Sequence, residues 1–454
     1  MARLFGTDGV RGIANKELTC ELAYKLGQAA AVVLTEDTKH KPKIMIGKDT
    51  RISSDMLEAA MTAGICSVGG DVISCGVIPT PAVAYLTRKY GADAGVVISA
   101  SHNSFEHNGI KIFNGQGFKL RDELEDEIEE IVKGESDKEK MASSEEIGRI
   151  IKPERAIDDY VRFLFDNTDT TFEDFRVVFD CANGATSAII PRFIHMFGVN
   201  ATVINAEPNG ININEKCGST HIEELSKTVT RLHAKVGIAF DGDGDRMLAV
   251  DENGILIDGD KLIAIFATKL KQENMLKNNT AVVTTMSNLG FFECMSNHEI
   301  NTSMTKVGDK YVLEEMLKNG YSIGGEQSGH IIFGDIATTG DGMLSAVKLL
   351  QILYKDKVKA SALGGIMEKY PQVLINVNVT RSYKEAHTDD EELLNLIDKY
   401  NAELEGKGRL IVRASGTEPL IRVMVEGKDF DEINEIAKDI AGVITKANQK
   451  INCN

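Results

Sequence analysis

The sequence predicts an α/β protein in which three related αβ domains with mixed sheets are followed by a smaller C-terminal α+β domain. Two patterns support this prediction. Short runs rich in β-branched residues alternate with longer helical stretches, which is typical of αβ units. In addition, one arrangement recurs three times along the chain, in which a strand ending in a polar loop is followed by a second strand ending in another.

Five apolar runs are predicted to be buried strands. They are KIMIGKD (43–49), AGVVISA (94–100), RVVFD (176–180), VGIAF (236–240) and AVVTT (281–285). The earlier loop of each pair spans 46–51, 178–185 or 283–288, and the later loop spans 96–103, 237–246 or 322–330. Ligands of open α/β sheets bind beyond the carboxyl ends of the strands. We therefore expect the three later loops to share one central cleft that holds the active site.

The pattern changes after residue 370, which predicts a separate C-terminal domain. Strands are expected over 373–379, 409–415 and 420–427, with a helix near 389–403 between the first two. The final helix carries an apolar face made by Ile433, Ile436, Ile440 and Val443. The predicted domains span residues 1–155, 156–255, 256–369 and 370–454.

Segment 122–132, DELEDEIEEIV, predicts an amphipathic helix. Its apolar face is formed by Leu124, Ile128, Ile131 and Val132. We expect its many acidic residues to form the solvated face of this helix and not a metal or partner site.

Composition narrows the class of protein. The 454 residues carry a formal net charge of −17, which argues against a nucleic-acid binder, because such proteins usually present a basic face. No apolar run is long enough for a membrane span, and the opening MARLFGTDGVRG has no signal-peptide core, so we expect a cytoplasmic protein. The seven cysteines include no C-x-x-C pair and fit reduced thiols.

The segment VGIAFDGDGDRMLAV (236–250) predicts a metal site. A buried strand leads into three aspartates at alternate positions, Asp241, Asp243 and Asp245. Clustered carboxylates repel one another unless a cation neutralises them, and hard oxygen ligands favour Mg²⁺. A solvated acidic turn is one alternative. A calcium EF-hand is another, but Arg246 stands where its loop needs glycine and a strand precedes the loop.

The segment GVVISASHNSFEHNGIKIF (95–113) brings Ser101 to a polar loop at a strand end. It lacks the G-x-S-x-G elbow of acyl hydrolases. A phosphorylated serine would offer strong acceptor oxygens to a metal ion, whereas the alternative is an ordinary serine turn. Lys111 follows on the next apolar run, either as a solvated charge or as a proton shuttle beside a phosphate.

Three further segments carry candidate binding residues. On the loop GGEQSGH, alternate residues of an extended backbone project the same way, so a carboxylate and a hydroxyl could grip vicinal sugar hydroxyls. RASGTEP with the following arginine has the donors of a phosphate cradle, and FGTDGVRG holds an arginine between glycines. Each segment alone could also be a structural turn. The candidates are Glu326, Ser328 and His330 on the first, Arg413, Ser415, Gly416, Thr417 and Arg422 on the second, and Arg11 on the third.

Together these motifs resemble the α-D-phosphohexomutase family over essentially the whole chain. The matching segments are FGTDGVRG (5–12), GKDTR (47–51), the serine loop, PNGININEKCGST (208–220), DGDGDR (241–246), KVGDKYV (306–312), GEQSGH (325–330), TTGDG (338–342) and RASGTEP (413–419). The opening RLFGTDGVRG, the glutamine of GEQSGH and TTGDG are most similar to bacterial members that act on glucosamine phosphates. One departure is Ser104, where the family often has proline, a residue that would fix the backbone.

The resemblance implies a role for each candidate residue. Ser101 would be the phosphoserine and would join the three aspartates around one Mg²⁺ ion. Lys111 and His330 would be general acid or base, with Arg246 and Arg11 beside the transferred group. Glu326 and Ser328 would bind the sugar hydroxyls. Arg413, Ser415, Gly416, Thr417 and Arg422 would hold the phosphate that does not react.

The implied reaction interconverts glucosamine 6-phosphate and glucosamine 1-phosphate through a bisphosphorylated sugar, with a sugar 1,6-bisphosphate as activator. Such an isomerase would supply amino-sugar precursors of peptidoglycan. Its partner would be a small phosphosugar, not nucleic acid or a membrane, and homodimers are common in the family. The alternatives are an enzyme of the same family acting on glucose or mannose phosphates, a non-catalytic metal-dependent phosphosugar sensor, and a calcium-binding structural protein.

Overall fold

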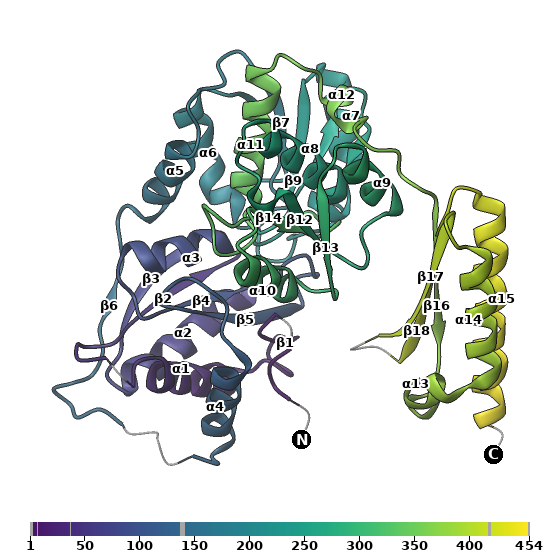
Figure 1. The fold of residues 1–454 in the computed structure, drawn as a ribbon. Helices are drawn as coiled ribbons and strands as arrows, with labels where there is room; N and C mark the ends of the chain where they lie inside the picture. Colours follow the sequence, from purple (N-terminus) through teal and green to yellow (C-terminus); the bar gives the residue numbers. More distant parts are fainter. Residues whose placement is uncertain (1–2, 7, 37, 137–140, 416–418, 453–454) are drawn as a thin grey trace. The chain divides into compact units, whose positions relative to one another are not determined.

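The computed structural model describes residues 3–6, 8–36, 38–136, 141–415 and 419–452. The chain divides into two compact units, which we describe separately (Figure 1). The first unit comprises Met1–Ser287 and His298–Ile366, and the second comprises Asn288–Asn297 and Met367–Asn454. Within the described ranges, no helix combines the length and apolar character needed to cross a bilayer.

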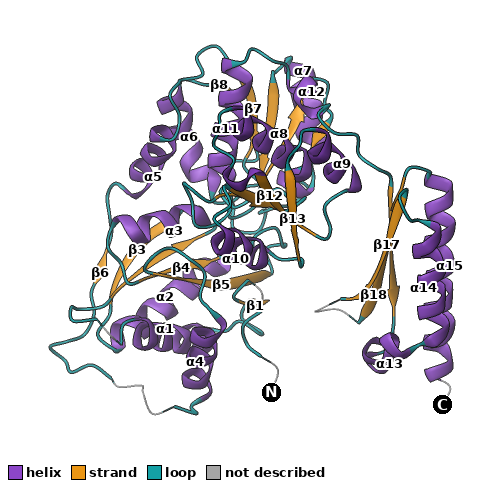
Figure 2. Cartoon of the chain, viewed as in Figure 1, coloured by secondary structure: helices purple, strands orange, loops and turns teal. Residues whose placement is uncertain are grey.

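The first unit contains three sheets with helices packed on them (Figure 2). The first sheet has the order β1-β5-β4-β2-β3-β6. Its strands are β1 (Val10–Ile13), β2 (Lys43–Lys48), β3 (Asp71–Val77), β4 (Ala94–Ile98), β5 (His107–Asn114) and β6 (Ile150–Ile151). The accompanying helices are α1 (Cys20–Leu34), α2 (Ile52–Ser67), α3 (Thr80–Lys89) and α4 (Asp122–Lys133).

The second sheet has the order β11-β10-β9-β7-β8, and the third has the order β13-β12-β14-β15. The second is built from β7 (Arg176–Asp180), β8 (Asn200–Ile204), β9 (Val236–Phe240), β10 (Met247–Asp251) and β11 (Leu256–Ile257), with α5 (Ala156–Asp166), α6 (Thr186–Phe197) and α7 (Glu223–Leu232). The third is built from β12 (Thr280–Thr284), β13 (Asn301–Thr305), β14 (Ile323–Gly325) and β15 (Ile331–Phe333), with α8 (Gly259–Gln272), α10 (Asp309–Asn319), α11 (Gly342–Lys355) and α12 (Ala360–Gly364).

One topology is repeated in all three sheets, as the sequence pattern predicts. The series β3-β2-β4-β5, β8-β7-β9-β10 and β13-β12-β14-β15 each have three parallel strands and an antiparallel fourth. In each sheet the two strands with functional loops are adjacent and parallel, so both loops emerge at the same edge. The predicted fold class of three related αβ domains is therefore confirmed.

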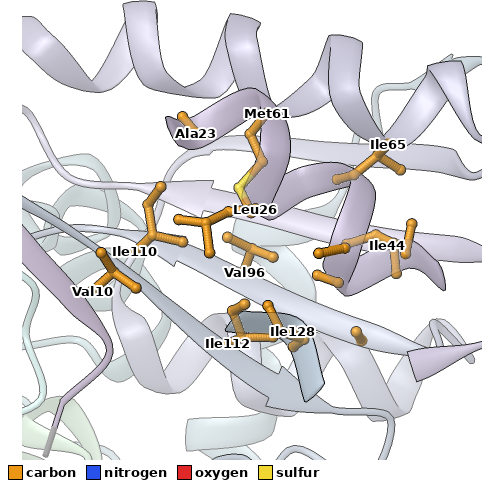
Figure 3. Close-up of a cluster of buried hydrophobic side chains, with 14 of the residues drawn as sticks. Val10, Ala23, Leu26, Ile44, Met61, Ile65, Val96, Ile110, Ile112 and Ile128 are labelled. Carbon is orange, nitrogen blue, oxygen red and sulfur yellow. The ribbon is translucent and has the colours of Figure 1, made fainter. Parts of the chain in front are cut away.

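The core of the first sheet fixes the position of α2, which begins directly after Arg51. Apolar side chains of the strands pack against α1, α2 and α4 (Figure 3). Helices α1 and α2 approach closely because Gly27 faces the Met61 carbonyl and Gly64 faces the Tyr24 carbonyl, leaving no room for a Cβ. These contacts hold the C-terminal half of α2 against α1.

Helix α4 has the predicted apolar face, but one of its acidic residues is not on the solvated face as expected. Ile128 and Ile131 are buried, and Leu124 and Val132 pack against the same core. Glu129 is buried as well, although we expected all the acids on the solvated face. Its carboxylate accepts the Leu4 backbone N–H at 2.9 Å, a donor that needs a partner once the N-terminal segment packs there.

The second unit contains a three-stranded antiparallel sheet in the order β16-β18-β17. Its strands are β16 (Gln372–Asn378), β17 (Gly408–Ala414) and β18 (Leu420–Gly427), and its helices are α9 (Leu289–Asn297), α13 (Arg381–Ala386), α14 (Glu391–Glu403) and α15 (Phe430–Asn452). Ile433, Ile436 and Ile440 of α15 are buried and Val443 packs against the same cluster, as predicted.

Helix α9 folds with the C-terminal residues, although its neighbours in sequence belong to the third sheet of the first unit. The Asn288 side chain accepts the Tyr370 N–H at 2.9 Å and donates to the Tyr370 carbonyl at 3.0 Å. It also donates to the buried carboxylate of Glu426, which accepts the Leu289 N–H at 3.2 Å and pairs with Arg409 at 2.6 Å. The sequence did not indicate this association, because α9 and the C-terminal residues both have ordinary amphipathic patterns.

Candidate active site

The three aspartates of the loop between β9 and β10 form one buried cluster. Each offers an oxygen that lies within 4.8 Å of the others, and no more than 5% of any of the three residues is exposed. Gly244 has φ +70° and turns the backbone between Asp243 and Asp245. A tight turn between two strands thus holds three carboxylates at one point.

The electrostatics of this cluster suit a cation. Burial, followed by repulsion from Asp243 and Asp245, raises the pKa of Asp241 well above its ordinary value. One buried oxygen each of Asp243 and Asp245, Oδ1 in both, has no hydrogen-bond partner in the described structure. Buried carboxylate oxygens without hydrogen-bond partners are donors that suit a hard metal ion, so the residues present fit a metal site.

Ser101 lies directly against this cluster. Its Oγ donates a hydrogen bond to Oδ2 of Asp241 at 2.6 Å, and only 1% of the residue is exposed. The backbone of Ser101 has φ +53°, in the left-handed region that a serine seldom adopts. The serine loop of the first sheet and the aspartate loop of the second therefore meet, as expected from their strand-end positions.

Lys111 joins the same centre from β5. Its Nζ lies 2.8 Å from Asp243 Oδ2, 3.5 Å from Asp245 Oδ2 and 3.1 Å from Asp8 Oδ2. Burial works to lower the pKa of Lys111, but these carboxylates, Asp243 first, raise it well above the ordinary value. The residue is therefore a buried ammonium ion and not the solvated charge of the alternative interpretation.

Further charged side chains connect this centre to the third sheet. Lys119 Nζ lies 2.7 Å from Asp8 Oδ1 and 2.5 Å from Asp309 Oδ2. His330 bridges onward, with Nε2 at 3.4 Å from Asp309 Oδ2 and Nδ1 at 3.6 Å from Asp245 Oδ2. Burial lowers the pKa of His330, but Asp245 and then Asp309 outweigh it and raise the pKa. All three αβ domains thus contribute to one charge network.

Two arginines lie at the edge of the network. Arg11 forms an ion pair with Asp8, and Arg246 contacts Nδ1 of His102 through Nη1 at 3.1 Å. The same His102 nitrogen lies 3.5 Å from Ser101 Oγ. Burial, then Arg246 and Arg11, lowers the pKa of His102 to about 4, so this ring is neutral at pH 7 and adds no charge beside the serine.

The loop between β14 and β15 is fastened to the aspartate loop. The Met247 N–H donates to the Gly329 carbonyl at 3.0 Å, which sets the loop beside β10. Glu326 accepts the Gly308 N–H at 3.1 Å through Oε1. The buried Oγ of Ser328 has no partner within the described part of the chain, so a hydroxyl is available for a ligand.

In the second unit, two arginines stand directly opposite each other. Arg413 of β17 and Arg422 of β18 are partners in the antiparallel ladder. Burial, followed by the charge of Arg422, lowers the pKa of Arg413. Like charges at such positions repel unless an anion lies between them. Ser415, two residues after Arg413 in the sequence, is buried. Gly416 and Thr417 fall outside the described residues.

The structure therefore assembles most of the predicted residues into two groups. Ser101, Lys111, Arg246, His330 and the aspartates form the centre of the first unit, with Arg11 joined to it through Asp8. Glu326 and Ser328 lie on the adjoining loop, and Arg413 and Arg422 form the pair in the second unit. Sequence analysis missed Asp8, Lys119, His102 and Asp309. Asp8, His102 and Asp309 belong to motifs that were identified from the sequence, but Lys119 lies in none of them.

Four family models together account for nearly the whole chain. All are described as phosphoglucomutase/phosphomannomutase, with alpha/beta/alpha domain I at residues 2–139, domain II at 158–254, domain III at 258–370 and the C-terminal domain at 374–443. The chain belongs to this family of phosphohexomutases, which are isomerases.

Individual relatives point to a narrower group. The chain is 54% identical to the phosphoglucosamine mutase of Acetivibrio thermocellus over 444 residues, which is 98% of this chain and 99% of that protein. Its fold is similar to a phosphoglucomutase/phosphomannomutase family protein of Burkholderia thailandensis, with TM-score 0.80, 21% identity and 98% coverage of both chains. It is also similar to Aspergillus fumigatus N-acetylphosphoglucosamine mutase, crystallised with GlcNAc-6P and magnesium, with TM-score 0.69, 17% identity and coverage of 98% and 96%.

Proposed function

We propose that this protein is a phosphoglucosamine mutase, which interconverts glucosamine 6-phosphate and glucosamine 1-phosphate in the cytoplasm on the route to peptidoglycan precursors. The observation that carries the proposal is the buried Ser101 hydroxyl, 2.6 Å from one of three converging aspartates. The 54% identity to a phosphoglucosamine mutase over nearly the full chain supports the choice of sugar.

Ser101 is the residue that carries the phosphoryl group in this proposal. Phosphorylated Ser101 donates its group to the free hydroxyl of the sugar monophosphate, which breaks the serine O–P bond and forms a sugar O–P bond. The bisphosphorylated sugar then turns around and returns its other phosphoryl group to Ser101. A sugar 1,6-bisphosphate therefore activates unphosphorylated enzyme, because it can load Ser101 directly.

Asp241, Asp243 and Asp245, together with a phosphoryl oxygen of Ser101, would hold one Mg²⁺ ion. This assignment is supported by the unpartnered oxygens of Asp243 and Asp245 and by their burial. When bound, a divalent ion neutralises charge on the transferred group. Lys111, a buried ammonium beside the aspartates, and His330 are the two candidates for general acid or base. Arg246 and Arg11 lie nearby as cations for the transferred group.

The remaining residues bind the rest of the substrate. The Glu326 carboxylate accepts hydrogen bonds from sugar hydroxyls, and the Ser328 hydroxyl donates to them. The unpartnered Ser328 Oγ supports this assignment. Arg413, Ser415, Gly416, Thr417 and Arg422 hold the phosphate that does not react, consistent with the opposed arginines of β17 and β18. By analogy with its family, the protein is also proposed to be a homodimer, which light scattering tests.

Substrate preference tests the proposal. Conversion of glucosamine 6-phosphate is compared with that of glucose 1-phosphate and mannose 1-phosphate, with Mg²⁺ and a catalytic amount of the matching bisphosphate. A higher kcat/KM for the amino sugar is expected. Preference for glucose or mannose would assign the chain to another branch of the family. No conversion of any sugar, with Ser101 found phosphorylated by mass spectrometry, would favour a phosphosugar sensor.

A further inference from the structure

The serine loop needs a restraint that its own sequence does not provide. Residues 99–106 between β4 and β5 form no helix or strand. Ser101 has φ +53°, a conformation that costs a residue with a Cβ roughly 1 kcal/mol or more. Residues 99–106 also include no proline that would limit the backbone. Neighbouring groups must therefore stabilise the loop.

Arg51 donates three hydrogen bonds to carbonyls of this loop. Its side chain is fully buried, directly before the start of α2. The guanidinium Nη2 donates to the Ser101 carbonyl at 3.0 Å and to the Asn103 carbonyl at 2.9 Å. Nη1 donates to the carbonyl of Ser104. One planar group thus fixes three carbonyls in a stretch of four residues.

Asp49 completes the restraint on the other side of Ser101. Its carboxylate pairs with Arg51 Nε at 2.8 Å and accepts the Ser99 hydroxyl at 2.6 Å. The Ser99 oxygen in turn accepts the Ser101 N–H at 2.9 Å. The peptide groups before and after the Ser101 Cα are therefore tied to the same buried ion pair, which fixes the direction of the Cα–Cβ bond.

Asn214 of the second αβ domain reinforces the same carbonyls. Its Nδ2 donates to Ser101 at 2.9 Å and to Asn103 at 3.0 Å. Gly242 of the aspartate loop packs against the Ser101 carbonyl, where an added Cβ would come within 2.6 Å. The serine loop is thereby aligned with the aspartates as well as with its own domain.

We infer that Arg51, supported by Asp49, is a positioning residue that aims the Ser101 oxygen at the metal-binding aspartates. This inference rests on the proposed phosphoryl transfer by Ser101. Lysine cannot replace Arg51, because a single ammonium cannot satisfy Asp49 and three carbonyls in one plane. Arg51 itself reaches neither the serine hydroxyl nor any carboxylate of the aspartate cluster in the described structure.

The test compares Arg51→Lys with Ser54→Ala. Ser54 Oγ donates to the same Asp49 carboxylate at 3.0 Å but contacts no serine-loop carbonyl, so its loss weakens the buried network without releasing Ser101. Arg51→Lys is expected to lower kcat by about 10–100-fold with a much smaller change in KM, as misalignment of a reacting group does. Ser54→Ala is expected to keep kcat close to that of the unmodified protein, with a smaller loss of melting temperature than Arg51→Lys.

Two readouts separate positioning from folding. Phosphorylation of Ser101 by glucose 1,6-bisphosphate, followed by mass spectrometry, should slow in Arg51→Lys in proportion to kcat. If Arg51→Lys does not fold, Asn214→Ala, which frees the same carbonyls from the other domain, should show the same lowered kcat to a smaller extent. An Arg51→Lys or Asn214→Ala enzyme with the kcat of Ser54→Ala would overturn the inference. Failure of the unmodified protein to convert any phosphosugar would instead overturn the proposed function.

Discussion

The two binding regions of this protein are built in opposite ways. Around Ser101, cations and carboxylates alternate at short distances, and nearly every group is buried and fixed by several neighbours. In the second unit, β17 and β18 place Arg413 and Arg422 side by side, two like charges that call for an anion. The first region is held together by opposite charges within the chain, whereas the second brings two like charges together. In the proposed reaction, the second region would receive the phosphate that does not react, while either end of the sugar reacts at the Ser101 centre.

The most severe way to break the fixed region is Ser101→Ala. Loss of the nucleophile should lower kcat by about 10⁴-fold or more, because alanine has no oxygen to carry the phosphoryl group. Substrate affinity, measured by calorimetry, should change little, since most binding contacts lie elsewhere. A variant that retained substantial turnover would refute the phosphoserine role.

Asp243→Asn should have the next largest effect. The amide keeps the size of the side chain but removes a charge that faces both Lys111 and the metal position. We expect kcat to fall by about 10²–10³-fold, with the Mg²⁺ concentration needed for half-maximal activity raised. Chelation should inactivate the unmodified enzyme reversibly. Asp335→Asn, at an exposed ion pair with Lys277, is the matched control and should titrate like the unmodified protein.

Arg413→Ala tests the proposed phosphate-binding pair of arginines in the second unit. Losing a charged hydrogen bond of about 1.5–3 kcal/mol should raise KM by about 10–100-fold, with a smaller effect on kcat. Without substrate, the second unit should gain up to about 0.5 kcal/mol in free energy of unfolding, because a like-charge pair is removed. Arg381→Ala, on the exposed surface of α13 in the same unit, is the control. Equal losses of stability and affinity would contradict the cradle interpretation.

Ser104→Pro should have the smallest effect. Since Arg51 already fixes the loop, adding the proline typical of the family should change the free energy of unfolding by no more than about 1 kcal/mol. Turnover should change far less than in Arg51→Lys. A large gain in kcat would mean that the loop is not held by Arg51, and would weaken that inference.

The sequence predicted the fold and the residues at strand ends well. Strand periodicity placed Arg176–Asp180, Val236–Phe240 and Leu420–Gly427 at their observed limits, because buried strands bounded by glycine and charge are distinctive. The aspartates and Ser101 could be found because their residue types and spacing carry their chemistry. Their roles remain predictions that the variants above test.

Groups that act through distant partners could not be found in this way. Asp49 and Arg51 belong to a quoted motif, yet their function depends on carbonyls of residues 101–104, and a carbonyl has no sequence signature. Lys119 matters because Asp8 and Asp309, far away in the chain, converge on it. Glu129 is similar, since only packing reveals the Leu4 N–H that needs an acceptor.

Because α9 packs with the C-terminal domain, it limits where this chain can be divided or recombined with a relative. The family model of domain III ends at residue 370, but Asn288, just before α9, is bonded to Tyr370 and to the buried carboxylate of Glu426. A gene fusion that exchanged only the residues after 370 would leave the Asn288 amide without its native acceptor, and the reciprocal fusion would bury Glu426 against a foreign helix. Recombination between relatives should therefore succeed more often when α9 and the C-terminal domain come from the same parent.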